Sequence, residues 1–338
     1  MISSVAKIFA ALLVFFVACE AETQRLPATS SAEYQTGELS ERTALGGVSS
    51  SSGERVDKQP NDEAQQPSQG EVHASELAER YVWLEEMEDI DQVISLSERF
   101  EPPEGFDRVE VESDSYAKFL RELPTLPDRT TVRAYDGRRL DSPAGAIVAL
   151  DVGDRDLQQC ATTAIRLRAE YLWQAGRHDE IAYHFSSGDR SAGSDWVDGE
   201  RFVTEGSSVE RRDGPQRSST RTTFREYLDH LFIYAGTMSL RYDAHAVAPQ
   251  DLQAGDLFVD PGSPGHAVIL LDIAESPDGR RAALVGQGFM PAQELHIVHD
   301  TTDRVLDDVW FLLPDEDHSD FDTPSWPTFS ADQALRFQ

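Results

Sequence analysis

The chain has 338 residues and a formal net charge of −31 at pH 7, with 30 Lys and Arg against 61 Asp and Glu. So acidic a chain lacks the basic surface that would displace counterions from phosphates, which excludes nucleic acid as a partner. Its length allows one large domain or two small ones.

The first residues indicate export. A single basic residue, Lys7, precedes the apolar run 8–18, which is too short for a stable membrane span and is typical of a signal peptide covering residues 1–18. Phe16-Val17-Ala18-Cys19 resembles a bacterial lipobox, which implies that Cys19 begins the mature protein and carries lipid. We therefore expect a cell-envelope lipoprotein, outer-membrane or periplasm-facing, or a secreted protein if Cys19 is not lipidated.

Residues 19–73 form an acidic segment rich in Ser, Gln and Glu, with few aromatic residues. Such a composition cannot bury enough apolar area to offset its ordering entropy, so it predicts a disordered linker that tethers the rest of the chain. Residues 74–338 are then expected to form a single domain.

Within that domain, apolar residues recur at helical spacing from Ala74 to Ile94, and 115–123 predicts a short helix. A strand is expected at 131–135, and the apolar run 146–152 predicts a buried strand. A long helix should follow from Asp156 to Gln174, with Asp154 or Asp156 as its N-cap and Gly176 as its stop.

A second helix is expected at 223–240, and the remaining sequence is strand-like, with predicted strands at 256–259, 266–273, 281–287, 294–298 and 309–313. Helices followed by a run of strands indicate an α+β fold, with a central helix packed on an antiparallel sheet.

Cys160 is the one cysteine besides Cys19, so lipidation of Cys19 would leave it without an intramolecular partner. It could be a buried inert thiol, the site of an intermolecular disulfide, or a nucleophile. It shares the apolar face of the predicted helix with Ala164 and Leu167. The start of a helix and a nearby imidazole both lower a thiol pKa, which favours a nucleophile.

His266 is the candidate base for that thiol. It opens an apolar strand directly after the Gly/Pro turn 261–265, where a polar side chain is expected to face a cleft. The strand returns through the turn 276–279, and pairing at a summed number of about 555 places Gln287 opposite Val268, beside His266. Gln287 is therefore predicted to orient the imidazole, with His296 as the reserve.

Gln159 precedes Cys160 and could supply a side-chain amide to an oxyanion, beside the backbone N–H of Cys160. No phosphate-binding glycine loop and no zinc-ligand spacing is present in the sequence, and Asp151, Asp154 and Asp156 lack the full pattern of a calcium loop. We therefore expect neither a cofactor nor a metal.

The order of Cys160, His266 and Gln287 resembles that of papain-like cysteine hydrolases. Gly255-Asp256-Leu257-Phe258 followed by His266-Ala267-Val268-Ile269 is similar to the NlpC-type cell-wall amidopeptidases, although those usually carry Asp-Cys-Ser-Gly where this chain has Gln159-Cys160-Ala161-Thr162. This resemblance implies a papain-like fold and a cysteine amidase or peptidase.

A closer resemblance extends over about residues 80–329. Five separated motifs, at 155–160, 166–172, 234–237, 264–268 and 290–294, resemble the DUF4846 family of uncharacterised bacterial lipoproteins. This resemblance implies an envelope lipoprotein and brings no activity with it.

The leading hypothesis is thus an envelope-anchored cysteine hydrolase of amide bonds, with cell-wall peptide as its expected substrate. Cys160 attacks, His266 moves the proton, Gln287 orients the imidazole and Gln159 holds the oxyanion. The alternative is a non-catalytic binding or scaffolding lipoprotein that uses the same cleft for a glycan, a peptide or a protein. In both cases the membrane is reached through the N-terminal lipid.

Overall fold

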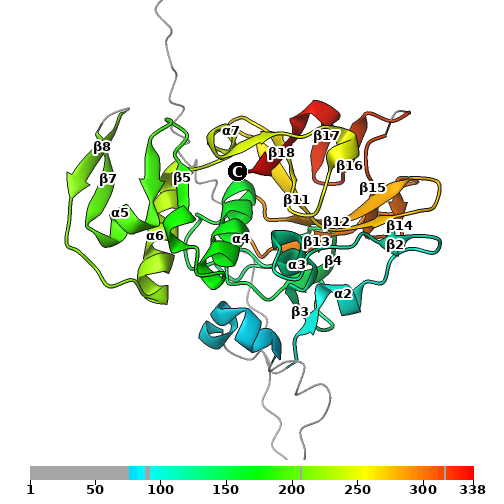
Figure 1. Cartoon of the computed structure of the whole chain (residues 1–338), viewed down its shortest axis with the longest axis horizontal. Coiled ribbons are helices and arrows are strands. Elements are labelled where there is room, and N and C mark those ends of the chain that lie inside the picture. The colour runs from blue at the N-terminus through cyan, green and yellow to red at the C-terminus, as the bar shows by residue number, and fades with distance from the viewer. Residues whose placement is uncertain (1–75, 88–91, 206–207, 316) are drawn as a thin grey trace, which may run out of the picture. The chain divides into compact units, whose positions relative to one another are not determined.

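The computed structural model describes residues 76–87, 92–205, 208–315 and 317–338, all of which lie in one compact unit, Ala64–Gln338 (Figure 1). The predicted signal peptide 1–18, the lipidation site Cys19 and the predicted linker 19–73 lie outside the described residues. Among the helices of the described part, none combines the length and the apolar character that a membrane span requires.

The described residues form an α+β fold around a large antiparallel sheet, as predicted. The main path of the sheet runs β1-β3-β4-β13-β12-β11-β10-β18-β9, with β2, β14 and β15 attached to it. Its strands are β1 (Ile94–Ser95), β2 (Asp107–Arg108), β3 (Pro124–Leu126), β4 (Ala144–Val148), β9 (Ala244–Ala246), β10 (Leu257–Asp260), β11 (His266–Glu275), β12 (Arg281–Gln287), β13 (His296–Val298), β14 (Val305–Leu306), β15 (Trp310–Leu312) and β18 (Ala334–Phe337).

Three hairpins and a small set of helices surround the sheet. The hairpins are β5–β6 (Ala182–His184, Arg190–Ala192), β7–β8 (Glu200–Glu205, Ser208–Asp213) and β16–β17 (Asp320–Thr323, Trp326–Ser330). The helices are η1 (Val82–Glu86), α2 (Leu96–Arg99), α3 (Tyr116–Arg121), α4 (Cys160–Gln174), η2 (His178–Glu180), α5 (Gly193–Val197), α6 (Arg221–Tyr234), α7 (Leu240–Asp243), η3 (Pro249–Asp251) and η4 (Ala331–Gln333).

The β11–β12 hairpin forms the centre of the sheet. Ile269 pairs with Gly286 and Leu270 with Val285, which confirms the predicted register. The register shifts between Leu270 and Asp272, where the fully buried Asp272 accepts hydrogen bonds from the Nε atoms of two arginines, Arg108 at 2.8 Å and Arg121 at 2.7 Å. A local turn thus fixes the pairing, and buried ion pairs hold the irregular point.

The sheet is buried on both faces. Alternate residues of β10 and β11 enter two separate apolar clusters: Val259 and Ile269 pack on the side of α4, whereas Phe258 and Val268 pack with Phe321 and other residues of the β16–β17 hairpin. Successive side chains of a strand point to opposite faces, so a continuous apolar run such as 267–271 satisfies both. The sheet therefore has α4 on one face and the hairpin on the other.

Buried charges fix α4 against α6. Arg166 is fully buried, and its Nε donates to Glu170 at 2.6 Å, while Arg221 of α6 donates to the same carboxylate. Burial lowers the pKa of Arg166, but Glu170 and Asp151 more than compensate, so its pKa is raised. Removing one partner of such a pair typically costs about 3–5 kcal/mol, because a buried charge is left uncompensated. The position of α4 is therefore firmly specified.

Four predicted elements were placed wrongly. The long helix begins at Cys160, with Gln159 as N-cap, and not at Asp156, because the Asp156 carboxylate instead accepts from the backbone N–H of Ala292. The second helix ends at Tyr234, and a break before Leu240 replaces its predicted last turns. The predicted strand 131–135 has only isolated bridges, and Ile94 belongs to β1 and not to a helix.

Candidate functional site

Cys160 is the first residue of α4, and its thiol is free and buried, with 6% of the residue exposed. Its Sγ lies 3.9 Å from the carbonyl oxygen of Gly265, and the backbone N–H of Ala267 also faces the sulfur. The thiol therefore touches the backbone on both sides of His266. The start of α4 thus lies against the start of β11.

Burial raises the pKa of the Cys160 thiol. The backbone N–H groups of Ala267, Ala161 and Cys160 itself act in the opposite direction, because each stabilises the thiolate, but they do not outweigh burial. The sulfur is thus a neutral thiol at neutral pH, and the expectation of a lowered pKa from the helix start is wrong for the resting protein.

His266 is fully buried, which corrects the prediction that it faces an open cleft. Its ring packs among aromatic side chains, with ring centroids 4.8 Å from Phe289 and 5.2 Å from Trp326. Burial lowers the pKa of His266 to about 4, while the hydrogen bond to Gln287 raises it and His296 lowers it further. The imidazole is therefore neutral at physiological pH.

Gln287 lies at the end of β12 and bridges two histidines. Its Oε1 is 3.0 Å from Nε2 of His266, and its Nε2 is 3.1 Å from Nε2 of His296. The other ring nitrogen of His296, Nδ1, lies 3.0 Å from the carbonyl oxygen of Glu294. His296, the reserve candidate, thus contacts Gln287 and not the imidazole of His266.

These contacts admit one consistent assignment of protons. Nδ1 of His296 must donate to the carbonyl of Glu294, so its Nε2 accepts from the amide of Gln287. The Gln287 Oε1 then accepts from Nε2 of His266, which leaves Nδ1 of His266 unprotonated. That Nδ1 is buried and has no hydrogen-bond partner. An unsatisfied basic nitrogen thus lies in the residue whose backbone neighbours touch the thiol.

The thiol and the imidazole are not hydrogen-bonded to each other, since Nδ1 has no partner. The thiol approaches the start of β11 from the α4 side, whereas the imidazole packs on aromatic side chains of the hairpin, on the other face of the sheet. Catalytic hydrogen bonds are often long in proteins without substrate and shorten in the complex. The two groups are connected through the first residues of β11, and they do not share an open cleft.

A cavity of about 370 Å³ opens beside Cys160. Its walls are the residues before and at the start of α4, the end of α6 with the following break, and the loop before β11; they include Asp156, Gln159, Ile233, Thr237, Pro264 and Met290. Thr237 reaches this place because α6 ends early, and its Oγ1 accepts from the N–H of Gly262 at 3.2 Å. The cavity gives a substrate access to the thiol, whereas His266 is not one of the residues that line it.

Gln159 lines this cavity, as its predicted role requires, but its Nε2 donates to Oδ1 of Asp156 at 2.9 Å. The N–H of Gln159 is bonded to Thr162 Oγ1. As first residue of the helix, Cys160 directs its own N–H toward the sulfur region, without a partner within α4. The backbone N–H of Cys160 is therefore the better placed donor to an oxyanion, with Gln159 as the second.

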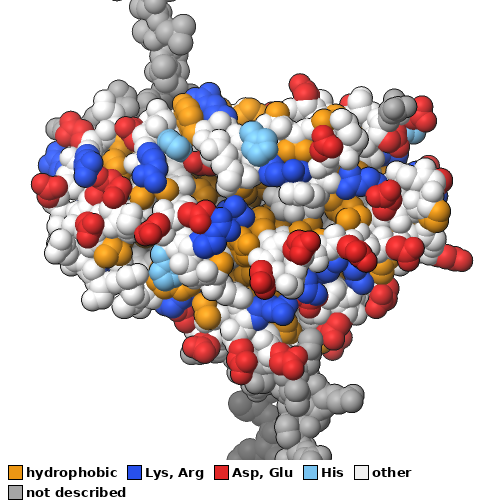
Figure 2. Space-filling model, in the orientation of Figure 1, with side chains coloured by type: hydrophobic (Ala, Val, Ile, Leu, Met, Phe, Trp, Pro, Cys, Tyr) orange, Lys and Arg blue, Asp and Glu red, His pale blue; other side chains and the backbone are white. Residues whose placement is uncertain are grey.

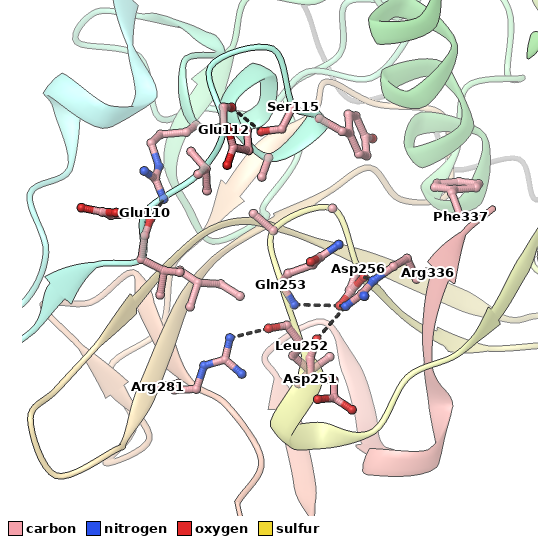
Figure 3. Close-up of a pocket in the computed structure, with 18 of the residues that line it drawn as sticks. Glu110, Glu112, Ser115, Asp251, Leu252, Gln253, Asp256, Arg281, Arg336 and Phe337 are labelled. Atoms are coloured by element: carbon pink, nitrogen blue, oxygen red, sulfur yellow. Dashed lines mark hydrogen bonds and ion pairs between the residues drawn. The ribbon is translucent and has the colours of Figure 1, made fainter.

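A larger cavity, of about 540 Å³, lies between α3, β18 and the loop 250–256 (Figure 3). In Figure 2, hydrophobic side chains gather in a hollow near the centre of the face where Figure 1 places α3, α4 and β18, with basic and acidic side chains around it. Figure 3 shows that the Asp256 carboxylate faces Arg336, and their closest atoms are 2.7 Å apart. No cysteine or histidine lines this cavity.

Sequence reasoning missed Ser325 and Trp326, which contact Gln287 and His266 respectively. Ser325 lies 38 residues from Gln287 in the chain, and no spacing rule connects them.

Among the described residues, no cluster of three or more His, Cys, Asp or Glu side chains could hold a metal ion.

Comparison with known proteins gives one match. The sequence model of DUF4846, described as a domain of unknown function (4846), matches residues 96–336, which include all the site residues named above except the lipidation site. No curated protein and no solved structure gives a significant match to the chain.

Proposed function

This chain belongs to the DUF4846 family, and we propose that it is a cysteine hydrolase of amide bonds with a papain-like site. Cys160 is the nucleophile, His266 the base and acid, and Gln287 the residue that orients the imidazole. The backbone N–H of Cys160, with Gln159, binds the oxyanion. The observation that carries the proposal is the unprotonated, unpartnered Nδ1 of His266 next to the chain segment that the thiol touches.

Acylation begins with a neutral pair. Nδ1 of His266 takes the proton of the Cys160 thiol as the sulfur attacks the carbonyl carbon of the substrate, and a C–S bond forms. The oxyanion accepts a hydrogen bond from the N–H of Cys160. As the intermediate collapses, the C–N bond breaks and the imidazolium gives its Nδ1 proton to the leaving amine.

Deacylation repeats these steps with water. Nδ1 of His266 takes a proton from a water molecule, whose oxygen attacks the thioester carbon. The C–S bond breaks, the acid leaves, and the Cys160 thiolate recovers the proton from the imidazolium. Gln287 serves both half-reactions, because its Oε1 accepts from Nε2 of His266 throughout and stabilises the imidazolium whenever it forms.

The substrate and location of this proposal rest on sequence. Lipid on Cys19 and the acidic segment 19–73 would tether the hydrolase in the cell envelope, where amide bonds of cell-wall peptide are its expected target. The cavity beside Cys160 has Asp156 as its acidic wall and Ile233 as an exposed apolar wall, 48% exposed. It is therefore suited to a peptide segment with neutral or basic side chains.

A binding lipoprotein that uses the same cleft for a glycan, peptide or protein partner remains the second candidate. It is favoured by one observation, the raised pKa of the buried Cys160 thiol, because a neutral buried thiol is also what a packing cysteine shows. In that case the cavity would bind its ligand without turnover.

Turnover and a trapped acyl-enzyme separate the two candidates. Purified protein is incubated with isolated cell-wall material and with a panel of peptides, and new amino groups are measured. In parallel, an activated ester such as p-nitrophenyl acetate is used to look for a mass increase of one acetyl group on Cys160. We expect both signals in the wild type and neither in Cys160→Ala. Ligand binding without either signal would contradict the hydrolase and support the binding protein.

A further inference from the structure

The β16–β17 hairpin has no role in the chemistry described so far. Its two strands pair only with each other among the described residues. It covers the face of the sheet opposite to α4, where Phe321 and Phe329 pack into the apolar cluster around Phe258. In Figure 1 it lies close to β18, at the C-terminal end of the chain. Packing alone would account for its phenylalanines but not for the polar residues at its turn.

Two residues at this turn contact the site directly. Ser325 Oγ accepts a hydrogen bond from Nε2 of Gln287 at 3.0 Å. The ring of Trp326 lies 5.2 Å from the ring of His266, at an interplanar angle of 38°. Trp326 is itself fixed, because its Nε1 donates to Oδ2 of Asp260 at 3.0 Å, and Asp260 is the residue of β10 that pairs with His266.

Ser325 helps to decide which way the amide of Gln287 points. The two amide hydrogens have two acceptors, Ser325 Oγ and His296 Nε2, so the NH₂ group is held away from His266. Only the carbonyl oxygen then faces His266, which forces the proton onto Nε2 of the imidazole and frees Nδ1. A flipped amide would present a donor, and the imidazole would take the opposite, unreactive tautomer.

The indole of Trp326 shields the hydrogen bond between His266 and Gln287 from water. Together with Phe289 and Phe329, at 4.8 and 6.1 Å from the imidazole, it surrounds the ring. The charged and titratable groups that act on His266 come from other elements: Asp260 of β10 and His296 of β13. Without the indole, water would reach the imidazole and compete with Gln287 for Nε2.

We propose that the β16–β17 hairpin is part of the site, with Ser325 and Trp326 as positioning residues that fix the amide of Gln287 and exclude water from its bond to His266. This inference rests on the proposed hydrolase function. Neither residue touches the substrate in this account. Both act through Gln287 and His266, so their loss should change the state of the imidazole before it changes substrate binding.

Four hairpin variants and two controls test it. Ser325→Ala and Trp326→Ala remove the proposed contacts, whereas Ser325→Thr keeps the hydroxyl and Trp326→Phe keeps a ring over His266. Ser319→Ala and Thr328→Ala are matched controls, because these exposed residues bond only to Asp320 and Asp322 of the same hairpin. Near-ultraviolet circular dichroism of each variant verifies that it is folded.

The first readout is the titration of His266 by NMR, which needs no substrate. Trp326→Ala should move its midpoint up by about one pH unit or more, toward the ordinary value of histidine, because water then solvates the imidazolium. Ser325→Ala should increase the population of the Nδ1–H tautomer. Trp326→Phe, Ser325→Thr and both controls should match the wild type.

The second readout is hydrolysis. Ser325→Ala and Trp326→Ala should lower kcat by about tenfold or more with KM unchanged, since misorientation of a catalytic group affects the chemical step. If the wild type does not hydrolyse, the proposed function fails, and the NMR titration alone decides on the hairpin. If the wild type hydrolyses but Ser325→Ala and Trp326→Ala match Ser319→Ala and Thr328→Ala in both readouts, the inference about the hairpin is wrong and the hydrolase stands.

Discussion

Two cavities of this domain differ in the chemistry of the groups on their walls. The larger of the two, in Figure 3, has Arg336 paired with Asp256 and Arg121 paired with Asp272, and it contains no cysteine or histidine. The smaller one contains the thiol of Cys160, which contacts the backbone beside His266, and the imidazole of that histidine has an unpartnered nitrogen. Between these two, size favours the first, and chemistry selects the second.

A buried polar group without a partner indicates where a reactive side chain lies. Buried polar groups in proteins are almost always hydrogen-bonded, so an exception with a defined tautomer requires an explanation. Nδ1 of His266 is such an exception, and its other nitrogen is held by a chain of three hydrogen bonds that ends on a backbone carbonyl. The larger cavity also has two unpartnered buried atoms, the hydroxyl of Tyr116 and Nε of Arg281, but neither is a base: an arginine nitrogen only donates, and burial raises the pKa of the Tyr116 hydroxyl.

The largest expected effect is that of removing the sulfur. Cys160→Ala should reduce amide hydrolysis by about 10⁴-fold or more, because no other group in the cavity can form the acyl intermediate. Rates of amine release from cell-wall material measure it. Equal rates in Cys160→Ala and the wild type would show that the thiol in the smaller cavity has no catalytic role.

The next effect is that of the amide that orients the imidazole. Gln287→Ala should reduce kcat by about 10²-fold, since both His266 tautomers become available and the imidazolium loses its acceptor. Gln293→Ala is a matched control, because Gln293 is a buried glutamine of the same domain that makes no contact with either histidine. A kcat that falls equally in both variants would mean that Gln287 acts only through packing.

A smaller effect concerns stability against pH. Burial lowers the pKa of His296 from 6.5 to about 4, so below pH 6.5 the unfolded chain binds a proton that the folded protein does not. The stabilising contribution of neutral His296 is therefore complete above pH 6.5 and is lost as the pH falls toward about 4. Relative to His296→Gln, the wild type should lose up to about 1.4 kcal/mol of unfolding free energy per pH unit in this window.

Urea unfolding of both proteins at several pH values measures this difference, and the titrating carboxylates common to both cancel in the comparison. A constant difference from pH 7 to 4 would show that His296 is protonated in the folded protein. In that case its Nε2 could not accept from Gln287, and the assigned tautomers would be wrong.

The smallest effect is expected in the larger cavity. Arg168 lies on α4, two turns after Cys160, with its guanidinium 5.0 Å from the ring of Tyr116. Arg168→Ala should cost about 0.5–1 kcal/mol of stability from the lost cation–π contacts and should leave hydrolysis within about twofold of the wild type. A large loss of activity would move the functional site toward the cavity of Figure 3.

Local sequence signals were sufficient to predict some contacts of the candidate site. The turn 276–279 fixes the register of β11 with β12, and the register brings Gln287 to His266. The start of α4 was misplaced because Asp154 and Asp156 are both acceptable N-caps, whereas the N-cap is Gln159 and Asp156 accepts from the backbone N–H of the distant Ala292. Local sequence does not encode such a contact.

Burial was the other property that sequence could not give. His266 stands at the mouth of a strand after a Gly/Pro turn, which indicates an exposed side chain, but the hairpin around Trp326 covers it from a position 60 residues later in the chain. Burial also reverses the expected pKa of Cys160, on the α4 side of the sheet. A thiol at a helix start is activated only when water or charge reaches it, and here both depend on tertiary packing.

The most direct test of the central claim, that Nδ1 of His266 takes the proton of the Cys160 thiol as the sulfur attacks, is the rate of Cys160 alkylation by iodoacetamide against pH in the native protein. Cys19 is first replaced by Ser, so that Cys160 is the single thiol. We predict a rate that rises through about pH 4 with the deprotonation of His266, stays level into the alkaline range because burial raises the pKa of the thiol, and loses this plateau in His266→Gln. A thiol that reacts only at alkaline pH, or only after unfolding, and does so equally in His266→Gln, would contradict the account.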